Sequence, residues 1–303
     1  MKMTSVASLV IASSVFSSLA SASVTIDWVT VGNPGNAAHS SGFGAVDHEY
    51  KIGKYEVTNT QYISFLNAKG QSNANGIYNT RMANYGITQS GSTGSFTYSV
   101  TGGLENRPVV YVSWFDAARF ANWMTNGQGN SDTETGAYTL NGASSGIILA
   151  NAGAQVYIPS ENEWVKAAYY NAMSQNYSAY PNGQNTISTA DANYSSSGST
   201  NVGSYSGSPS SYGTYDQGGN VWEWNDGLPP GFSTHGRGTR GNGWIQFGNA
   251  AVDYLRITGI LDGTDPIIEN PAIGFRLASA VPEPSAMLLS MSACGMMLIR
   301  RKR

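Results

Sequence analysis

Cysteine is almost absent from this chain of 303 residues, because the single one, Cys294, lies in an apolar segment close to the C-terminus. The rest of the sequence therefore offers no disulfide bond, no thiolate nucleophile and no cysteine ligand for zinc. Stability has to come from a hydrophobic core instead. The roughly 255 residues between the two ends are enough for one large domain.

Charged residues are also scarce, at 12% of the chain against about 25% in an average globular domain. Glycine, serine, asparagine, threonine and tyrosine take their place, which suits an extracellular surface. Before Arg300 the lysines and arginines form no cluster. This distribution argues against nucleic acid or anionic lipid as a partner.

The N-terminus has the three parts of a secretory signal peptide. Lys2 supplies the cation, residues 6–19 are apolar, and Ala20-Ser21-Ala22 has the small residues after which signal peptidase cuts. We expect residues 1–22 to be a signal peptide and the protein to be exported through the Sec pathway. The alternative, a short buried helix, is disfavoured by the position of the segment behind a cation at the extreme terminus.

The C-terminus has a second three-part pattern. Val281-Pro282-Glu283-Pro284-Ser285 is followed by an apolar run over residues 286–299 and then by Arg300-Arg301-Lys302-Arg303. This order resembles the PEP-CTERM sorting signal. The resemblance implies that residues 281–303 contact the membrane transiently, with the cations on the cytoplasmic face, and that an exosortase-type enzyme removes them. The product would be at the cell surface or outside the cell; the alternative is a retained C-terminal anchor.

Three segments have the start signals of helices. Thr58 with Gln61, and Ser160 with Glu163, have the spacing of a capping box, and Ser113 is a cap with Asp116 in the first turn. Gly70 is expected to end the first helix. The aromatic residues that follow each start are interpreted as core.

Short β-like runs occupy residues 109–112, 156–158 and 272–277, and no repeat or regular alternation of strands with helices is present. Long connections rich in glycine, serine, asparagine and tyrosine, such as Ser195 to Tyr215, separate them. The pattern indicates an α+β domain with much irregular structure.

Six short motifs between residues 50 and 277 are similar, in the same order, to motifs of the formylglycine-generating enzyme family, also called the sulfatase-modifying factor family. They are Tyr55-Glu56-Val57-Thr58-Asn59; Arg107-Pro108-Val109 before Ser113-Trp114; Ile158-Pro159-Ser160-Glu161-Asn162-Glu163-Trp164; Gly219-Asn220-Val221-Trp222-Glu223-Trp224; Arg240-Gly241-Asn242-Gly243-Trp244; and Gly274-Phe275-Arg276. The resemblance implies that residues 23–280 form a domain with the α+β, C-type-lectin-like fold of that family, rich in irregular loops.

The same resemblance implies a structural calcium ion. It places the carboxylates of Asp216 and Glu223 and the backbone carbonyls of Gly219 and Val221 as metal ligands, and calcium prefers such mixed oxygen donors. The alternative is that Asp216 caps a turn and Glu223 is a partly solvated acid. A second calcium site of the family would start at Asn193, where no clear acidic partner follows.

The copper site of the family is where this chain departs from the pattern. Family enzymes bind copper through two cysteines shortly before the closing Gly-Phe-Arg, and residues 253–258 contain none. Since Cu(I) needs soft donors, we expect no copper, no catalytic residues of the family type and no formylglycine-generating oxidase activity. The histidines, His39, His48 and His235, are interpreted as surface residues rather than iron ligands.

The sequence therefore predicts an exported surface or extracellular-matrix protein whose domain is a binding or structural module. The expected partner is an extracellular polysaccharide or a surface protein, contacted through loops rich in tyrosine, asparagine and serine. The alternative is an oxidoreductase-type enzyme of the same family with a rebuilt, non-thiolate metal centre, for which Asp253 and Arg256 are the nearest candidates.

Overall fold

The computed structural model describes residues 23–228, 236–245, 248–259 and 261–281. The predicted signal peptide, and the predicted sorting segment after Val281, lie outside these residues. Within the described residues, no helix is long and apolar enough to cross a membrane.

The helices are few and short, and all three predicted ones are present. They are α1 (Asn59–Lys69), α2 (Trp114–Thr125) and α3 (Glu161–Tyr169). Two further short helices are the 3-10 helix η1 (Thr80–Tyr85) and α4 (Asn249–Tyr254).

Capping fixes where these helices begin, as the sequence indicates. The side chain of Thr58 accepts from the backbone N–H of Gln61, and Gln61 accepts in return from that of Thr58. The same reciprocal pair joins Ser160 to Glu163. Ser113 and Asp116 also form a reciprocal capping box. The sequence analysis had predicted only that Ser113 is a cap and that the charge of Asp116 is favourable in the first turn.

Two four-stranded sheets form the centre of the molecule. One has the order β1 (Trp28–Val31), β2 (Tyr50–Gly53), β12 (Ala278–Ala280), β5 (Val156–Tyr157), and the other the order β10 (Leu261–Thr264), β9 (Arg237–Arg240), β8 (Trp222–Trp224), β11 (Ile273–Phe275). All neighbours are antiparallel except β8 and β11, which are parallel. Two hairpins are separate: β3 (Ile87–Ser90) with β4 (Thr97–Val100), and β6 (Tyr170–Asn171) with β7 (Asn176–Tyr177).

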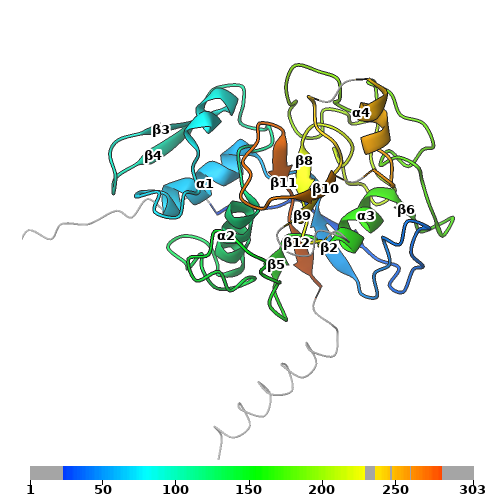
Figure 1. Ribbon diagram of the computed structural model, residues 1–303, viewed down its shortest axis with the longest axis horizontal. Coiled ribbons are helices and arrows are strands. Elements are labelled where there is room, and N and C mark those ends of the chain that lie inside the picture. Colours follow the sequence, from blue (N-terminus) through cyan, green and yellow to red (C-terminus); the bar gives the residue numbers. More distant parts are fainter. Residues whose placement is uncertain (1–22, 229–235, 246–247, 260, 282–303) are drawn as a thin grey trace, which may run out of the picture.

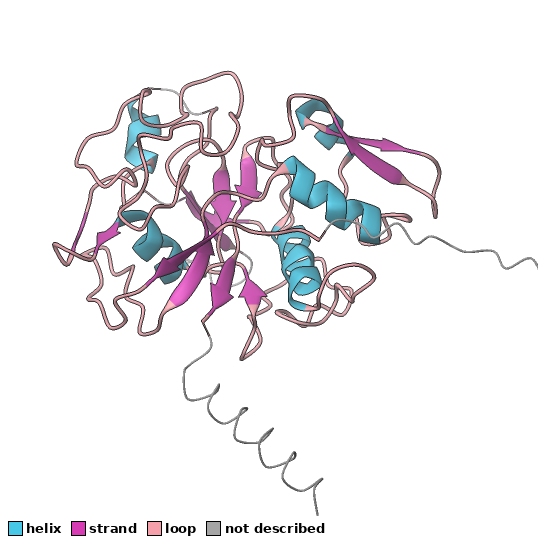
Figure 2. Ribbon diagram, turned by 180° about the vertical axis from the view of Figure 1, so that it is seen from behind, coloured by secondary structure: helices cyan, strands magenta, loops and turns pink. Residues whose placement is uncertain are grey.

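The elements lie on two sides of these sheets. Helices α1 and α2 and the β3–β4 hairpin cover one side, and α3, α4 and the β6–β7 hairpin lie on the other (Figure 1). Seen from behind, long loops connect most of the elements (Figure 2). The expected mixed α and β domain with much irregular structure is confirmed.

The strand predicted at residues 109–112 is wrong. Tyr111 has a left-handed backbone, with φ of 59°, which interrupts an extended run. Val109 instead bonds through its N–H to the carbonyl of Val57, and Tyr111 to that of Asn270. The other two predicted strands are present in shorter form as β5 and β11.

An aromatic cluster joins α1 and α2 to the second sheet. Tyr62 and Phe65 of α1 contact Phe120 of α2 with ring centroids 5.8 and 5.4 Å apart, and Phe120 contacts Phe275 of β11 at 5.6 Å. All four side chains are fully buried. Their packing holds β11, and through it the neighbouring β8, against the helices.

Candidate functional site

Strand β8 carries the predicted calcium ligand Glu223 into the middle of the protein. Trp222, Glu223 and Trp224 are all buried, because β8 is an inner strand with β9 on one side and β11 on the other. The two tryptophans pack in the large hydrophobic core with α1 and α2. Glu223 faces α3, where its carboxylate meets Trp164.

A buried ion pair occupies the carboxylate of Glu223. Arg276 donates from Nε to Oε2 at 2.5 Å and from Nη2 to Oε1 at 2.6 Å, and the indole N–H of Trp164 donates to Oε2 at 2.7 Å. The side chains of Glu223 and Arg276 are both 0% exposed. The guanidinium also donates to the carbonyls of Gly53 and Tyr215. Arg276 therefore connects β2, the second sheet and the end of the Ser195 to Tyr215 connection.

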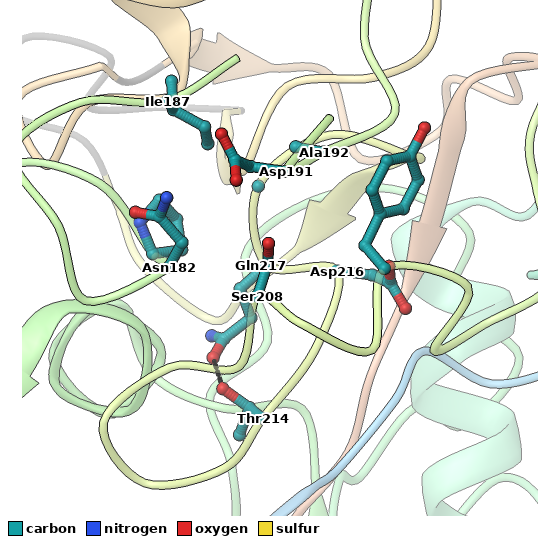
Figure 3. A pocket seen from close by; sticks show the side chains of 11 residues that line it. Asn182, Ile187, Asp191, Ala192, Ser208, Thr214, Asp216 and Gln217 are labelled. Carbon is teal, nitrogen blue, oxygen red and sulfur yellow. Dashed lines mark hydrogen bonds between the residues drawn. The ribbon is translucent and has the colours of Figure 1, made fainter. Parts of the chain in front are cut away.

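The predicted ligand Asp216 lies at the start of the turn that precedes β8. Its backbone is left-handed, with φ of 61°, and its Oδ2 accepts from the backbone N–H of Gly203 at 2.6 Å. Burial raises the pKa of this carboxyl to about 6, and the negative charge of Glu223 acts in the same direction. Asp216 also lines a cavity of about 10 Å³, with Asp191 and Asn182 among the other residues around it (Figure 3). This is space for about one water or ion.

The turn itself depends on Gly219, which has φ of +85°. A Cβ at this position would be 2.6 Å from the carbonyl oxygen of Asn193, so no other residue fits. The N–H of Gly219 donates to the carbonyl of Gly241. Val221, whose carbonyl is the fourth predicted ligand, is fully buried in the core.

A third carboxyl, Glu56, belongs to the same buried group. Its Oε1 accepts from the amide of Asn220 at 3.0 Å, whereas its Oε2 is buried and has no partner among the described residues. Burial raises the pKa of Glu56 well above the ordinary value, and the charges of Asp216 and Glu223 add to this effect. Burial and the two neighbouring carboxylates therefore favour the neutral form of Glu56, which reduces the excess of negative charge around Arg276.

Calcium fits this arrangement only in part. Calcium takes 6–8 oxygen ligands, and both oxygens of Glu223 are already bound by N–H donors. Asp216 has a second oxygen with no partner among the described residues. Within the described part of the chain, no group of three or more histidine, cysteine, aspartate or glutamate side chains is arranged to hold a metal. The calcium site thus stays a prediction.

Asp253 and Arg256, the candidates for a rebuilt enzyme centre, lie on the surface. They form an ion pair of 3.6 Å between side chains that are 74% and 46% exposed. Arg256 lies over the ring of Tyr180. Among the described residues, no group of three or more histidine, cysteine, aspartate or glutamate side chains gathers at this position.

His48 is a charged site that the sequence analysis did not predict. Its Nδ1 lies 2.9 Å from Asp47 and its Nε2 lies 3.2 Å from Glu163, the N3 residue of α3. The bond to Glu163 is the largest cause of a rise in the pKa of His48 to about 9. Glu163 also accepts from the hydroxyl of Tyr157 at 2.7 Å. His48 therefore links the loop before β2 to α3.

The fold defines a class of protein that is represented among solved structures. CarF matches with a TM-score of 0.58 at 22% identity, over 85% of this chain and 99% of that protein. Treponema denticola variable protein 1 matches with a TM-score of 0.54 at 22% identity, over 86% of this chain and 96% of that one. These likenesses show a common fold.

Residues 33–281 match the sulfatase-modifying factor enzyme 1-like domain, and the chain belongs to this family. Two curated relatives are serine/threonine-protein kinases pkn1, of Chlamydia caviae and Chlamydia pneumoniae. Each is 27% identical, over 177 and 179 residues respectively, which is 58% of this chain. The chain spans only 22% of the length of each kinase, so the match concerns one region of a larger protein.

Proposed function

We propose that this family domain acts as a binding or structural module of the cell surface or extracellular matrix, and does not oxidise cysteine to formylglycine. The main support is the donor chemistry. The domain has the family fold, yet the one cysteine of the chain is Cys294, outside the matched region 33–281. Cu(I) binds soft thiolate ligands, and residues 253–258 supply only oxygen, guanidinium and hydrocarbon groups.

Export is the second part of the proposal. It rests on the two terminal sequence patterns, residues 1–22 for secretion and residues 281–303 for exosortase-type sorting. The neutral, polar composition of the domain agrees with a location at the cell surface or beyond it. The C-type-lectin-like class, to which we assign the fold, is suited to such a location because a compact core supports long loops that are available for recognition.

Calcium is the proposed structural cofactor, with Asp216, Glu223 and the carbonyls of Gly219 and Val221 as ligands. The small cavity beside Asp216 and the uncommitted oxygen of this residue support it. The Arg276 pair opposes it at Glu223, because a cation there would have to replace a guanidinium. A calcium ion bound to Asp216 would neutralise the buried charge of this carboxylate and fix the turn before β8.

The competing function is an enzyme with a rebuilt metal centre at Asp253 and Arg256. The exposed position of this pair disfavours it. Elemental analysis of the purified protein separates the two functions: calcium alone, or no metal, agrees with the binding module, whereas stoichiometric iron or copper would overturn it.

A binding experiment tests the module directly. The purified protein, its ends defined by intact-mass measurement, is incubated with the extracellular matrix of the producing cells, and the retained fraction is measured. We expect saturable retention that survives washing at moderate salt, since residues 23–280 have no basic cluster for non-specific attraction. A protein that is not retained by the matrix or by the cell surface would contradict the proposed function.

A further inference from the structure

Two adjoining cavities lie between the N-terminal segment and the beginning of α1. Their volumes are about 190 and 390 Å³, and they share Thr25, Asp27, Tyr55, Thr58 and Gln61. The larger one extends to Asn106 and Val202. Together they form one groove, here called the N-terminal groove, built from five parts of the chain that are far apart in the sequence.

Hydrogen bonds fix the walls of the N-terminal groove. The side-chain amide of Gln128 donates to the carbonyl of Val24 at 2.8 Å and accepts from its N–H at 2.7 Å. Gln61 donates to the carbonyl of Thr25 at 2.9 Å, and the carbonyl of Asp27 accepts from the N–H of Lys54 at 2.7 Å. The extended segment before β1 is therefore held in place on both sides, so the groove is formed before any ligand arrives.

The opposite wall is also built closely. The ring of Tyr55 stacks on Tyr215 with centroids 5.6 Å apart. Gly203 approaches the edge of this ring, where a Cβ would be only 2.7 Å from it. The N–H of Val202 donates to the carbonyl of Asn106. Tyr55 is thus a rigid aromatic surface in the groove.

Several polar groups of the groove have no partner among the described residues. They are the carboxylate of Asp27, the side-chain amide of Asn106 and the hydroxyl of Tyr55. By contrast, the amide of Gln61 and the hydroxyl of Thr60 are bonded within the protein. Oε2 of Glu56, which lines the smaller cavity, is also without a partner among the described residues. The groove therefore combines fixed walls with unpartnered carboxylate, amide and phenol groups.

We infer that the N-terminal groove binds a neutral polysaccharide chain, an inference that rests on the proposed binding function and assigns its site. Sugar rings present hydroxyls to carboxylate and amide groups and C–H faces to an aromatic ring, which is what Asp27, Asn106 and Tyr55 offer. The larger cavity has the size of an ordinary ligand pocket, about 300–1,000 Å³. Its open connection to the smaller one suits consecutive units of a chain.

The charge of the lining selects against other ligands. Asp27 is the only charged side chain among the shared residues, so a phosphate or another polyanion would be repelled. The mostly polar lining of the smaller cavity likewise disfavours an apolar ligand. A neutral glycan agrees with both observations.

The test uses laminarin, dextran and xylan as soluble neutral probes, with affinity electrophoresis as the measurement. Asp27→Ala and Asn106→Ala alter exposed side chains, and Glu49→Ala, an exposed acid outside the groove, is the matched control. Thermal unfolding of each variant verifies folding. We expect wild type and Glu49→Ala to bind at least one polymer equally and each groove variant to bind it at least tenfold more weakly.

Other outcomes overturn the inference in distinguishable ways. If wild type binds a polymer and the groove variants bind it as well as Glu49→Ala does, the site is wrong and the binding function stands. If no polymer binds and retention by the cell matrix disappears after protease treatment of that matrix, the partner is a protein and the glycan inference fails. If nothing retains the protein, both the inference and the proposed function are wrong.

Discussion

Replacing Glu223 by glutamine keeps the shape of the side chain and removes the charge that faces Arg276. The guanidinium is completely buried, and two of its N–H groups are bonded to Glu223 at 2.5 and 2.6 Å. Removing one partner of such a pair leaves an uncompensated buried charge, which costs about 3–5 kcal/mol. The indole N–H of Trp164 can still donate to the amide oxygen, so the loss is expected to come from the charge.

Urea denaturation measures this effect. For a domain of this size, with a slope of about 3 kcal/mol per molar, the midpoint of Glu223→Gln should fall by about 1–2 M. The double variant with Arg276→Met removes both charges and is expected to recover part of the loss. Asp253→Asn is the control, because its exposed pair with Arg256 should contribute less than about 1 kcal/mol.

A midpoint of Glu223→Gln within about 0.3 M of the wild-type value would refute the argument. Such a result would mean that Arg276 is balanced by another group, or that Glu223 is not paired in solution. Repeating the wild-type measurement with calcium and with a chelator shows whether the same carboxylate also responds to a cation.

Three further predictions concern the ends, the metal and the pH response. Intact-mass measurement of protein recovered outside the cell should show that residues 1–22 and 286–303 are gone; an attached tail would contradict exosortase-type processing. Chelation should lower the melting temperature, since free calcium at a hundredfold excess over its dissociation constant stabilises by about 2.7 kcal/mol, and Asp216→Asn should abolish this response; a response that persists would refute the assigned ligand. Because the folded pKa of His48 is raised from 6.5 to about 9, its stabilising effect is complete below pH 6.5 and is lost as the pH rises through 9. His48→Gln should therefore flatten the change in urea midpoint between these values, and an unchanged profile would contradict the pairing with Glu163.

Local signals predicted the helices well because each capping box is short and contiguous in sequence. Thr58 with Gln61 and Ser160 with Glu163 need no distant partner to form. The prediction of a strand at residues 109–112 was wrong because the backbone there depends on a contact with a distant part of the chain. The apolar residues of this segment are buried as expected, but the left-handed backbone of Tyr111 is set by contacts with Asn270, far along the chain.

The sequence analysis named residues of the candidate site, such as Glu223, but not the hydrogen bonds that they make. The motif around Glu223 drew attention to this segment, but the buried strand at residues 222–224 was not predicted. A sequence also cannot show that Arg276 binds both carboxylate oxygens, because buried arginines are rare and depend on their partners. The connection from Ser195 to Tyr215 was expected to expose its tyrosines. Instead Tyr212 donates to the carbonyl of Gly32, and Tyr215 stacks on Tyr55. The N-terminal groove escaped notice because its walls come from parts of the chain as far apart as Ser23 and Leu277.

Strand β12 also sets the time at which the protein can fold. Residues 278–280 form β12, which lies between β2 and β5. The first sheet therefore lacks this inner strand until almost the entire domain has been synthesised. If the chain crosses a membrane through a narrow pore, its first sheet would consequently stay incomplete for nearly the whole passage. This would favour export over premature folding. A protease that cuts soon after Val281 would act only a few residues along the sequence from β12, so cleavage and the closing of this sheet concern neighbouring parts of the chain.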